Sequence, residues 1–252
     1  MLKVDLAGQR ILVTGAATIG IGRACALMLA GQGAEVWINH LGQSGASADL
    51  VEQIRSAGGR AVAIEADVSD PDAVEEMFAC ITATGPLHGL VNNAGIIQEQ
   101  SFLDTSEEDW RRIMAVDLDG VYRCCRCALE SMSGAGRGAI VNIASELGQL
   151  GRENYVAYCT AKAGVIGMTK ALAREFAPAI RINAVAPGPV ETAMVSLEHM
   201  SEEWIAKELA IPAARLGQPE EIAAAVCFLL SPAASFFTGQ TLGANGGAWM
   251  GS

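Results

Sequence analysis

The chain has 252 residues, of which 51% are hydrophobic, and its formal net charge is −11 at pH 7. This acidic balance disfavours nucleic acid as a partner, because there is no basic stripe to neutralise a phosphate backbone. No apolar run approaches the roughly 18 residues of a membrane span, and the start of the chain does not resemble a signal peptide. The length fits one α/β domain.

The seven cysteines do not have the spacing of a disulfide framework. Cys124, Cys125 and Cys127 share one predicted helix, but their spacing is not CxxC and no histidine cluster accompanies them. We therefore expect reduced thiols, no metal site and a cytoplasmic protein.

Short apolar segments alternate with helical patterns along the chain. The segments that predict strands are residues 10–14, 35–39, 61–65, 88–92, 139–143, 180–186 and 240–242. Helices are predicted from the glycine-rich turn to about residue 30, from Pro71, and over residues 106–132, 156–176 and 220–230. This alternation predicts a single-domain, doubly wound parallel β-sheet of about seven strands flanked by helices, with ligands at the carboxyl ends of the strands.

A glycine-rich turn, GAATIGIG, follows the first predicted strand and precedes a helix. Glycines let the backbone approach a pyrophosphate closely, and the N-terminus of a helix offers N–H donors and a partial positive charge. The turn therefore predicts a dinucleotide site, to which we assign Gly15, Thr18, Ile19, Gly20 and Ile21.

The second predicted strand ends where a dinucleotide-binding protein reads the adenosine ribose. An aspartate there would accept a hydrogen bond from the 2′-hydroxyl and repel a 2′-phosphate. This chain has Asn39 and His40 instead, followed by Leu41 and Gly42. With neither an acid nor a fixed cation present, we expect both NAD and NADP to be accepted. His40 is either a cofactor contact or a solvated loop histidine.

The chemistry is predicted at Ser145, Tyr158 and Lys162. Tyr158 and Lys162 lie four residues apart, which places them on one face of the predicted helix. The lysine charge is expected to lower the tyrosine pKa from about 10 towards working pH, so that the phenol exchanges a proton with an alcohol or ketone oxygen. Ser145, at the end of a strand, can hydrogen-bond the same oxygen. Tyr and Lys at this spacing also occur by chance on amphipathic helices.

Ser145 followed by the YCTAK stretch resembles the active site of the short-chain dehydrogenase/reductase family, and the likeness extends from the VTG at Val13 to the GG at Gly246. The resemblance implies that Tyr158 is the acid/base, that Ser145 orients the substrate oxygen, and that Lys162 binds the nicotinamide ribose. It also implies further cofactor contacts from Asp67, Val68, Asn93, Ala94, Gly95, Pro187, Gly188, Val190 and Thr192. As a bare sequence, Asp67 is equally a cap for the helix that opens at Pro71.

Two positions depart from the family pattern. Glycines 15, 20 and 22 make the turn one residue longer than the family's TGxxxGxG. Asp117 stands where the family has Asn, described as a fourth catalytic member that acts largely through its main-chain carbonyl. A carboxylate at this position either raises the pKa of Lys162 or forms a structural hydrogen bond.

The resemblance implies an NAD(P)-dependent oxidoreductase of a secondary alcohol or ketone. We expect a small ketone, sugar or polyol as the substrate, bound by Ser145, Glu146, Tyr158 and Met194 under a lid at about 189–212. A reductase of 3-oxoacyl groups on acyl carrier protein is the alternative, disfavoured because an acidic carrier needs basic residues near the entrance. A non-catalytic dinucleotide sensor is the remote alternative.

Small and apolar residues on two predicted helices indicate a homo-oligomer, and the family resemblance implies a tetramer. One set is Cys124, Cys125, Cys127 and Ala128, and the other is Ala163, Gly167, Ala171 and Ala173. Alternatively, these residues only face their own sheet.

Overall fold

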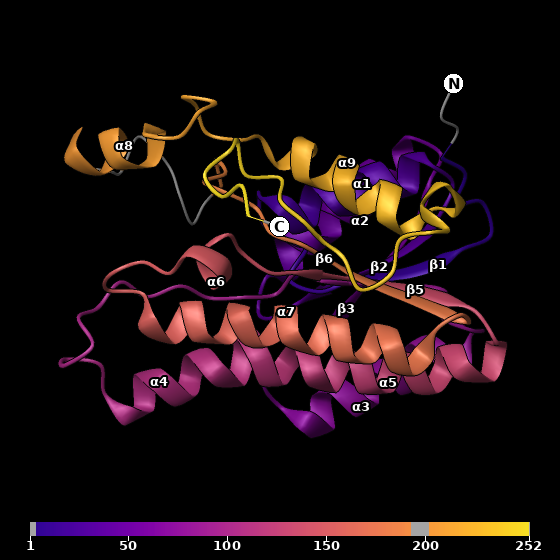
Figure 1. The fold of residues 1–252 in the computed structure, drawn as a ribbon. Coiled ribbons are helices and arrows are strands. Elements are labelled where there is room, and N and C mark those ends of the chain that lie inside the picture. Colours follow the sequence, from indigo (N-terminus) through magenta and orange to yellow (C-terminus); the bar gives the residue numbers. More distant parts are fainter. Residues whose placement is uncertain (1–3, 193–201, 252) are drawn as a thin grey trace.

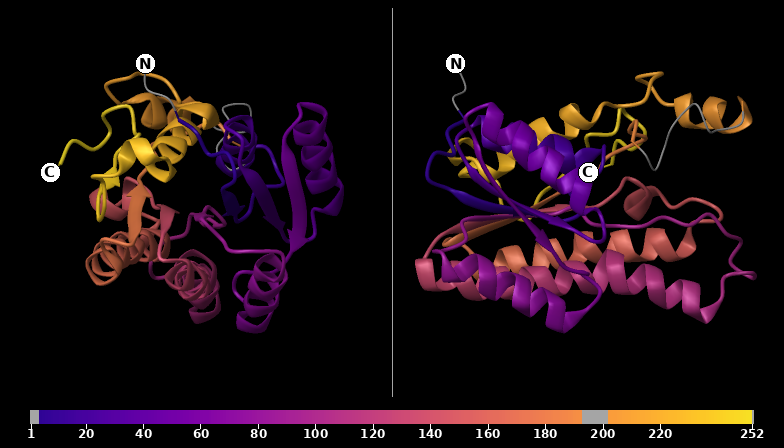
Figure 2. Two further views of the ribbon diagram at one scale, coloured as in Figure 1. Left: turned by 90° about the vertical axis from the view of Figure 1, so that its right-hand side faces the viewer. Right: turned by 180° about the vertical axis from the view of Figure 1, so that it is seen from behind.

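The computed structural model describes residues 4–192 and 202–251 and contains a seven-stranded parallel sheet with helices on both faces (Figures 1 and 2). The strand order is β3-β2-β1-β4-β5-β6-β7. The strands are β1 (Arg10–Val13), β2 (Glu35–His40), β3 (Arg60–Glu65), β4 (Gly89–Asn92), β5 (Gly138–Ile143), β6 (Ile180–Val185) and β7 (Thr241–Leu242). Because β1 pairs with both β2 and β4, the order reverses there, and a ligand crevice forms at the carboxyl ends of these strands. The predicted doubly wound parallel sheet is confirmed.

The helices form two layers around this sheet. One layer consists of α1 (Ile21–Gly31), α2 (Ser44–Ser56) and α9 (Pro219–Leu230), and the other of α3 (Pro71–Ala83), α4 (Glu107–Met114), α5 (Gly120–Ala135) and α7 (Val156–Phe176). Successive strand residues point to opposite faces, so Ile11 and Val13 join the first core and Leu12 joins the second. Coverage of both faces explains why the strands appear in the sequence as continuous apolar runs.

The predicted helix over residues 106–132 is not continuous. A π-helical segment, η1 (Ala115–Asp119), separates α4 from α5, and α5 continues to Ala135, where Gly136 adopts a left-handed conformation with φ 69°. The expectation of one regular helix was wrong because contacts from elsewhere in the chain hold Asp117 inward, fully buried. Single-turn π segments often occur at functional sites.

Two short helices, α6 (Leu147–Leu150) and α8 (Glu202–Leu209), and a 3₁₀ turn, η3 (Pro232–Ala234), complete the described elements. Part of the lid predicted at 189–212, including Met194, lies outside the described residues. Of the helices that the structure describes, none is long and apolar enough to cross a membrane. All seven cysteines are free thiols.

Candidate active site

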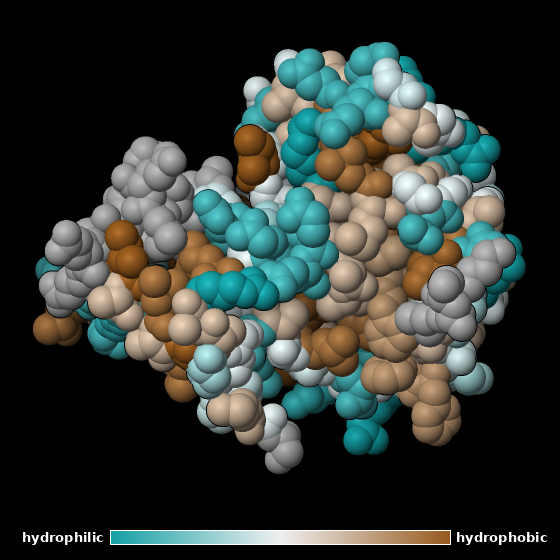
Figure 3. Space-filling model, turned by 90° about the horizontal axis from the view of Figure 1, so that it is seen from above, coloured by the Kyte–Doolittle hydropathy of each residue, from teal (hydrophilic) through white to brown (hydrophobic). Residues whose placement is uncertain are grey.

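A cleft of about 940 Å³ lies at the carboxyl ends of the strands, between the glycine-rich turn and α7. On the face seen in Figure 3, the part of the molecule that carries α8 projects to the left of the main body. The predicted site residues that line the cleft are Gly15, Thr18, Ile19, Gly20, Ile21, Asn39, Asp67, Val68, Asn93, Ala94, Gly95, Asp117, Ser145, Glu146, Tyr158, Lys162, Pro187, Gly188, Val190 and Thr192. The fold thus brings together residues from nearly the whole chain.

The glycine-rich turn is fastened to the end of β4. Asn93 donates from Nδ2 to the carbonyl oxygens of Thr14 and Gly15, at 2.9 and 3.0 Å, and the Thr14 hydroxyl accepts from the N–H groups of Asn93 and Ala94. A Cβ on Gly15 would lie 2.8 Å from the Cα of Ala94, and one on Gly22 would lie 2.4 Å from Asn93 Nδ2. Only glycine fits at these two positions, so the turn stays close to β4.

The longer turn still ends at the N-terminus of α1, where Gly20 has φ 152°. Thr18, Ile19 and Gly20 line the cleft, and Ile19 is 75% exposed. Backbone N–H groups at a helix start, next to glycines that allow close approach, suit a pyrophosphate. The residues present therefore fit a dinucleotide despite the extra residue.

The end of β2 differs from expectation. Asn39 Oδ1 accepts from the N–H of Gly15 at 3.2 Å, and Asn39 Nδ2 donates to the carbonyl of Ala66 at 2.9 Å. His40 is not a solvated loop residue, because β2 continues through it and its side chain is 5% exposed. It also does not line the cleft, which is bordered here by Leu41 and Gln43. Because neighbouring strand residues face opposite ways, the His40 side chain lies on the other side of β2 from Asn39, and this geometry does not support the expected contact between His40 and the ribose.

Asp67 and the helix cap are separate features. The cap of α3 is Asp70, whose carboxylate accepts from the N–H groups of Asp72 and Ala73. Asp67 instead accepts from the N–H and hydroxyl of Ser69, at 2.8 and 2.7 Å, and remains on the cleft wall. Of the two expectations for Asp67, the helix cap is wrong.

Lys162 occupies the centre of a buried charged group. Its Nζ lies 3.2 Å from Asp117 Oδ2, donates to the carbonyl of Ile143 at 3.2 Å, and lies 5.5 Å from the ring centroid of Tyr158. Asp117 Oδ1 accepts from the N–H of Ile96 at 2.9 Å. A Cβ on Gly95 would come within 3.0 Å of Asp117 Oδ2, so glycine there leaves room for the ion pair. Asp117 thus makes both an ion pair and a structural hydrogen bond.

The pKa values of this group run against one expectation. Burial raises the pKa of Tyr158, and although Lys162 opposes this effect, Asp117 adds to it, so the net direction is upward. The expected net lowering of the Tyr158 pKa is therefore not found in this structure, because burial of the phenol, together with the Asp117 carboxylate, outweighs the lysine charge. For Lys162, burial lowers the pKa, but Asp117 and Tyr158 outweigh it and the net pKa is raised, as expected for a carboxylate at position 117.

Ser145 lies beside the phenol. Tyr158 and Ser145 share a side-chain hydrogen bond, and the serine oxygen also accepts from the N–H of Leu147 at 3.1 Å. Both residues line the cleft, where a phenol and a hydroxyl side by side can hold one substrate oxygen.

A buried polar chain that the sequence analysis missed positions α7. Asn92 Nδ2 donates to Asn142 Oδ1 at 2.8 Å, and Asn142 Nδ2 donates to the hydroxyl of Thr169 at 2.9 Å. Asn92 and Asn142 pair across β4 and β5. The available signal was an asparagine within each of two apolar strands, since a buried amide needs partners.

A second missed group lies at the α8 end of the cleft. It comprises Arg152, Tyr155 and Glu208, which line the cleft with Glu146. Arg152 Nη1 pairs with Glu208 Oε1 at 2.5 Å, and the hydroxyl of Tyr155 donates to Glu99 at 3.2 Å. No sequence pattern links Arg152 to Glu208, because they are 56 positions apart.

Comparisons with known proteins agree with this geometry. The sequence model of a family described as enoyl-(acyl carrier protein) reductase matches residues 15–248. The chain is 40% identical to 3-oxoacyl-[acyl-carrier-protein] reductase FabG of Staphylococcus aureus (strain Mu50), over 95% of this chain and 97% of that protein. It is also 40% identical to the Vibrio cholerae protein of the same name, over 98% of this chain and 100% of the relative.

A solved structure from Sinorhizobium meliloti 1021, described as a short-chain alcohol dehydrogenase, superposes with a TM-score of 0.92 at 37% identity. It covers 97% of this chain and 98% of its own. A parallel sheet with a dinucleotide cleft at its switch point and an adjacent Ser–Tyr–Lys group defines a Rossmann-fold oxidoreductase. More specifically, the chain belongs to the short-chain dehydrogenase/reductase family. It is an enzyme that acts on CH–OH groups with NAD or NADP.

Proposed function

We propose that the enzyme interconverts a small secondary alcohol and its ketone, with a small ketone, sugar or polyol as the substrate. The observation that supports this proposal most directly is that Ser145, Tyr158 and Lys162 line the same cleft as the glycine-rich turn. The nicotinamide, when bound, supplies the hydride chemistry. Ser145 holds the substrate oxygen, the phenol of Tyr158 gives or takes its proton, and Lys162 steadies the phenol and binds the nicotinamide ribose.

In this proposal Pro187, Gly188, Val190 and Thr192 hold the nicotinamide, and Asn93 to Gly95 lie along its ribose. The test is absorbance at the nicotinamide wavelength over a panel of alcohols and ketones, with NAD and NADP each supplied. Turnover that disappears in Tyr158→Phe supports the proposal. If the purified enzyme turns over none of the panel with either cofactor, the proposal fails.

The second candidate is a 3-oxoacyl-[acyl-carrier-protein] reductase, which is favoured by the names of relatives at 40% identity. The charge of the chain argues against this candidate, because an acidic carrier protein would be repelled by a chain of net charge −11. Reduction of a 3-oxoacyl thioester on carrier protein, compared with the same acyl group on a short thiol, distinguishes the two. A large preference for the carrier-bound form would favour this candidate over the first.

We further propose that the region of the predicted lid shapes substrate choice. Glu208 and Lys207 on α8 form ion pairs with Arg152 and Glu153 on the loop before α7, and these pairs tie α8 to the cleft wall. Loosening α8 should therefore alter KM for the substrate more than that for the cofactor. Lys207→Ala removes one of these ion pairs, and comparing its KM values for the substrate and for the cofactor with those of wild type tests this expectation.

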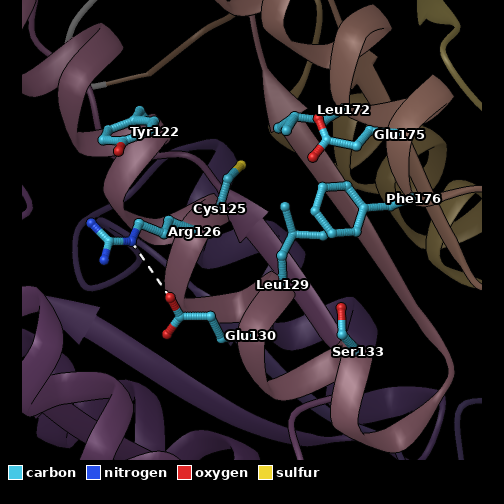
Figure 4. A pocket seen from close by; sticks show the side chains of 9 residues that line it. All are labelled: Tyr122, Cys125, Arg126, Leu129, Glu130, Ser133, Leu172, Glu175 and Phe176. Atoms are coloured by element: carbon cyan, nitrogen blue, oxygen red, sulfur yellow. Dashed lines mark hydrogen bonds and ion pairs between the residues drawn. The ribbon is translucent and has the colours of Figure 1, made fainter.

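We propose a homotetramer as the active form. A groove of about 460 Å³ between α5 and α7 is lined by Tyr122, Leu129, Leu172 and Phe176 among others, with Arg126 paired to Glu130 (Figure 4). On α5, Cys124, Cys125 and Ala128 face their own sheet, and Ala173 on α7 is likewise buried in the core, whereas Ala163, Gly167 and Ala171 on α7 are exposed. The exposed α7 residues suit close helix pairing. A stable, active monomer in light scattering at micromolar concentration would refute the proposal.

The proposed compartment is the cytoplasm. All seven cysteines are free, and thiols persist where the surroundings are reducing. Cell fractionation with an antibody to the protein tests this assignment.

A further inference from the structure

Glu146 is a buried carboxylate directly after Ser145 in the wall of the cleft. It is 4% exposed, and its Oε2 is buried without a hydrogen-bond partner. Its main chain is held in place, because its N–H donates to the carbonyl of Pro187 at 3.0 Å and its carbonyl accepts from Gln149 at 2.8 Å. The backbone that carries Glu146 is thus held next to Ser145, and the side chain has an acceptor atom left over.

The polar side chains that line this end of the cleft with Glu146 have hydrogen-bond partners of their own. The Arg152 guanidinium pairs with Glu208 Oε1 at 2.5 Å, and the Tyr155 hydroxyl donates to Glu99. A buried carboxylate oxygen without a donor costs folding free energy. A ligand bound in the cleft can supply the missing donor.

The charges of this group restrict what that ligand can be. When Glu146, Glu208 and Arg152 are all ionised, the two carboxylates outnumber the one guanidinium and the group has a net negative charge. A substrate carboxylate at this place would therefore be repelled. An acyl chain would place methylene groups against Glu146 and leave Oε2 without a donor. A neutral hydroxyl supplies an O–H donor and fits both restrictions.

The position of Glu146 indicates where on the substrate this hydroxyl is carried. Ser145 and Glu146 are consecutive residues and both line the cleft, so a substrate that contacts Ser145 also extends along the part of the wall that contains Glu146. Ser145 is assigned to the reacting oxygen. A hydroxyl on the carbon next to the reacting one is the substrate group with the shortest separation from that oxygen, and we assign it to Glu146.

We propose that Glu146 determines specificity by accepting a hydrogen bond from a hydroxyl on the carbon next to the reacting one. The substrate class is then a vicinal diol and its hydroxyketone, as found in polyols and sugars. This inference depends on the proposed oxidation of small secondary alcohols. It assigns the enzyme's choice among small secondary alcohols to Glu146.

The test uses matched alcohols that differ by one hydroxyl, butan-2-ol against butane-2,3-diol and cyclohexanol against 1,2-cyclohexanediol. The measured quantity is the ratio of kcat/KM for the diol to that for the monoalcohol at pH 8, above the raised Glu146 pKa of about 7, where Glu146 is ionised and can accept. We expect wild type to favour the diol by about tenfold or more, as for loss of a hydrogen bond to a charged group. Glu146→Leu should reduce the ratio by about tenfold, and Glu146→Gln, which keeps an acceptor oxygen, should retain part of it.

The matched control is Glu76→Gln, the same chemical change at an exposed site on α3, which should leave the ratio at the wild-type value. Cofactor binding measured by fluorescence titration checks that each variant is folded. If wild type oxidises both alcohols but the ratio is unchanged in Glu146→Leu, this inference is overturned and the proposed function stands. If wild type oxidises neither alcohol with either cofactor, the proposed function fails, and this inference fails with it.

Discussion

Glu146→Gln should stabilise the protein at alkaline pH and have little effect at acid pH. Burial raises the pKa of Glu146 from 4.5 to about 7, with Arg152 opposing the shift and Glu208 adding to it. Between these two values the unfolded chain releases the proton while the folded chain still holds it. Stability therefore falls as pH rises from about 4.5 to about 7, and the loss is complete above that range.

The size of this effect follows from the shift of about 2.5 units, the difference between about 7 and 4.5, at 1.36 kcal/mol per unit. The carboxylate therefore costs about 3 kcal/mol at pH 8 as an upper value, and less than about 1 kcal/mol at pH 5. Glutamine has the same shape and does not ionise, so it avoids this cost.

The assay is urea unfolding of wild type and Glu146→Gln at pH 5 and pH 8, at one protomer concentration because assembly also adds stability. We expect the variant to gain free energy of unfolding mainly at pH 8. Glu76→Gln, at an exposed position, should show no such difference between the two pH values. A Glu146→Gln variant that is less stable than wild type at pH 8 would mean that the carboxylate has a partner in the folded protein.

Four further predictions concern the cleft. Tyr158→Phe should lower turnover by roughly 10²–10⁴ while cofactor dissociation constants stay within a few fold, and near-normal activity would remove Tyr158 from the mechanism. Lys162→Ala should move the pH profile of alcohol oxidation to higher pH, since the phenol loses its stabilising charge. Asp117→Asn should move that profile the other way, because the Asp117 carboxylate raises the pKa of Tyr158, and a shift in the same direction as Lys162→Ala would contradict this electrostatic role. The preference between NAD and NADP should stay under about a hundredfold, which corresponds to about 2.7 kcal/mol. The preference should be equal at pH 6 and pH 8, because His40 does not line the cleft. Dissociation constants of both cofactors at the two pH values check this.

The sequence by itself determined the elements and the main motifs. The sequence pattern located all seven strands to within one or two residues, and for the five strands other than β3 and β7 the reason is burial on both faces, which favours an apolar segment. The glycine-rich turn and the spacing of Tyr158 and Lys162 were also readable, since both depend on local geometry within a few residues. The predicted cofactor and catalytic residues other than His40 line one cleft in the described part of the chain.

Only the tertiary structure decided which way particular side chains face and what they meet. His40 turns away from the cleft because β2 continues through it, and Asp117 turns inward within a π-helical segment to reach Lys162. Arg152 pairs with Glu208, and an oxygen of Glu146 is buried without a hydrogen-bond partner. These contacts join residues tens of positions apart. Local periodicity carries no information about such pairs, because they are set by how the layers pack around the sheet.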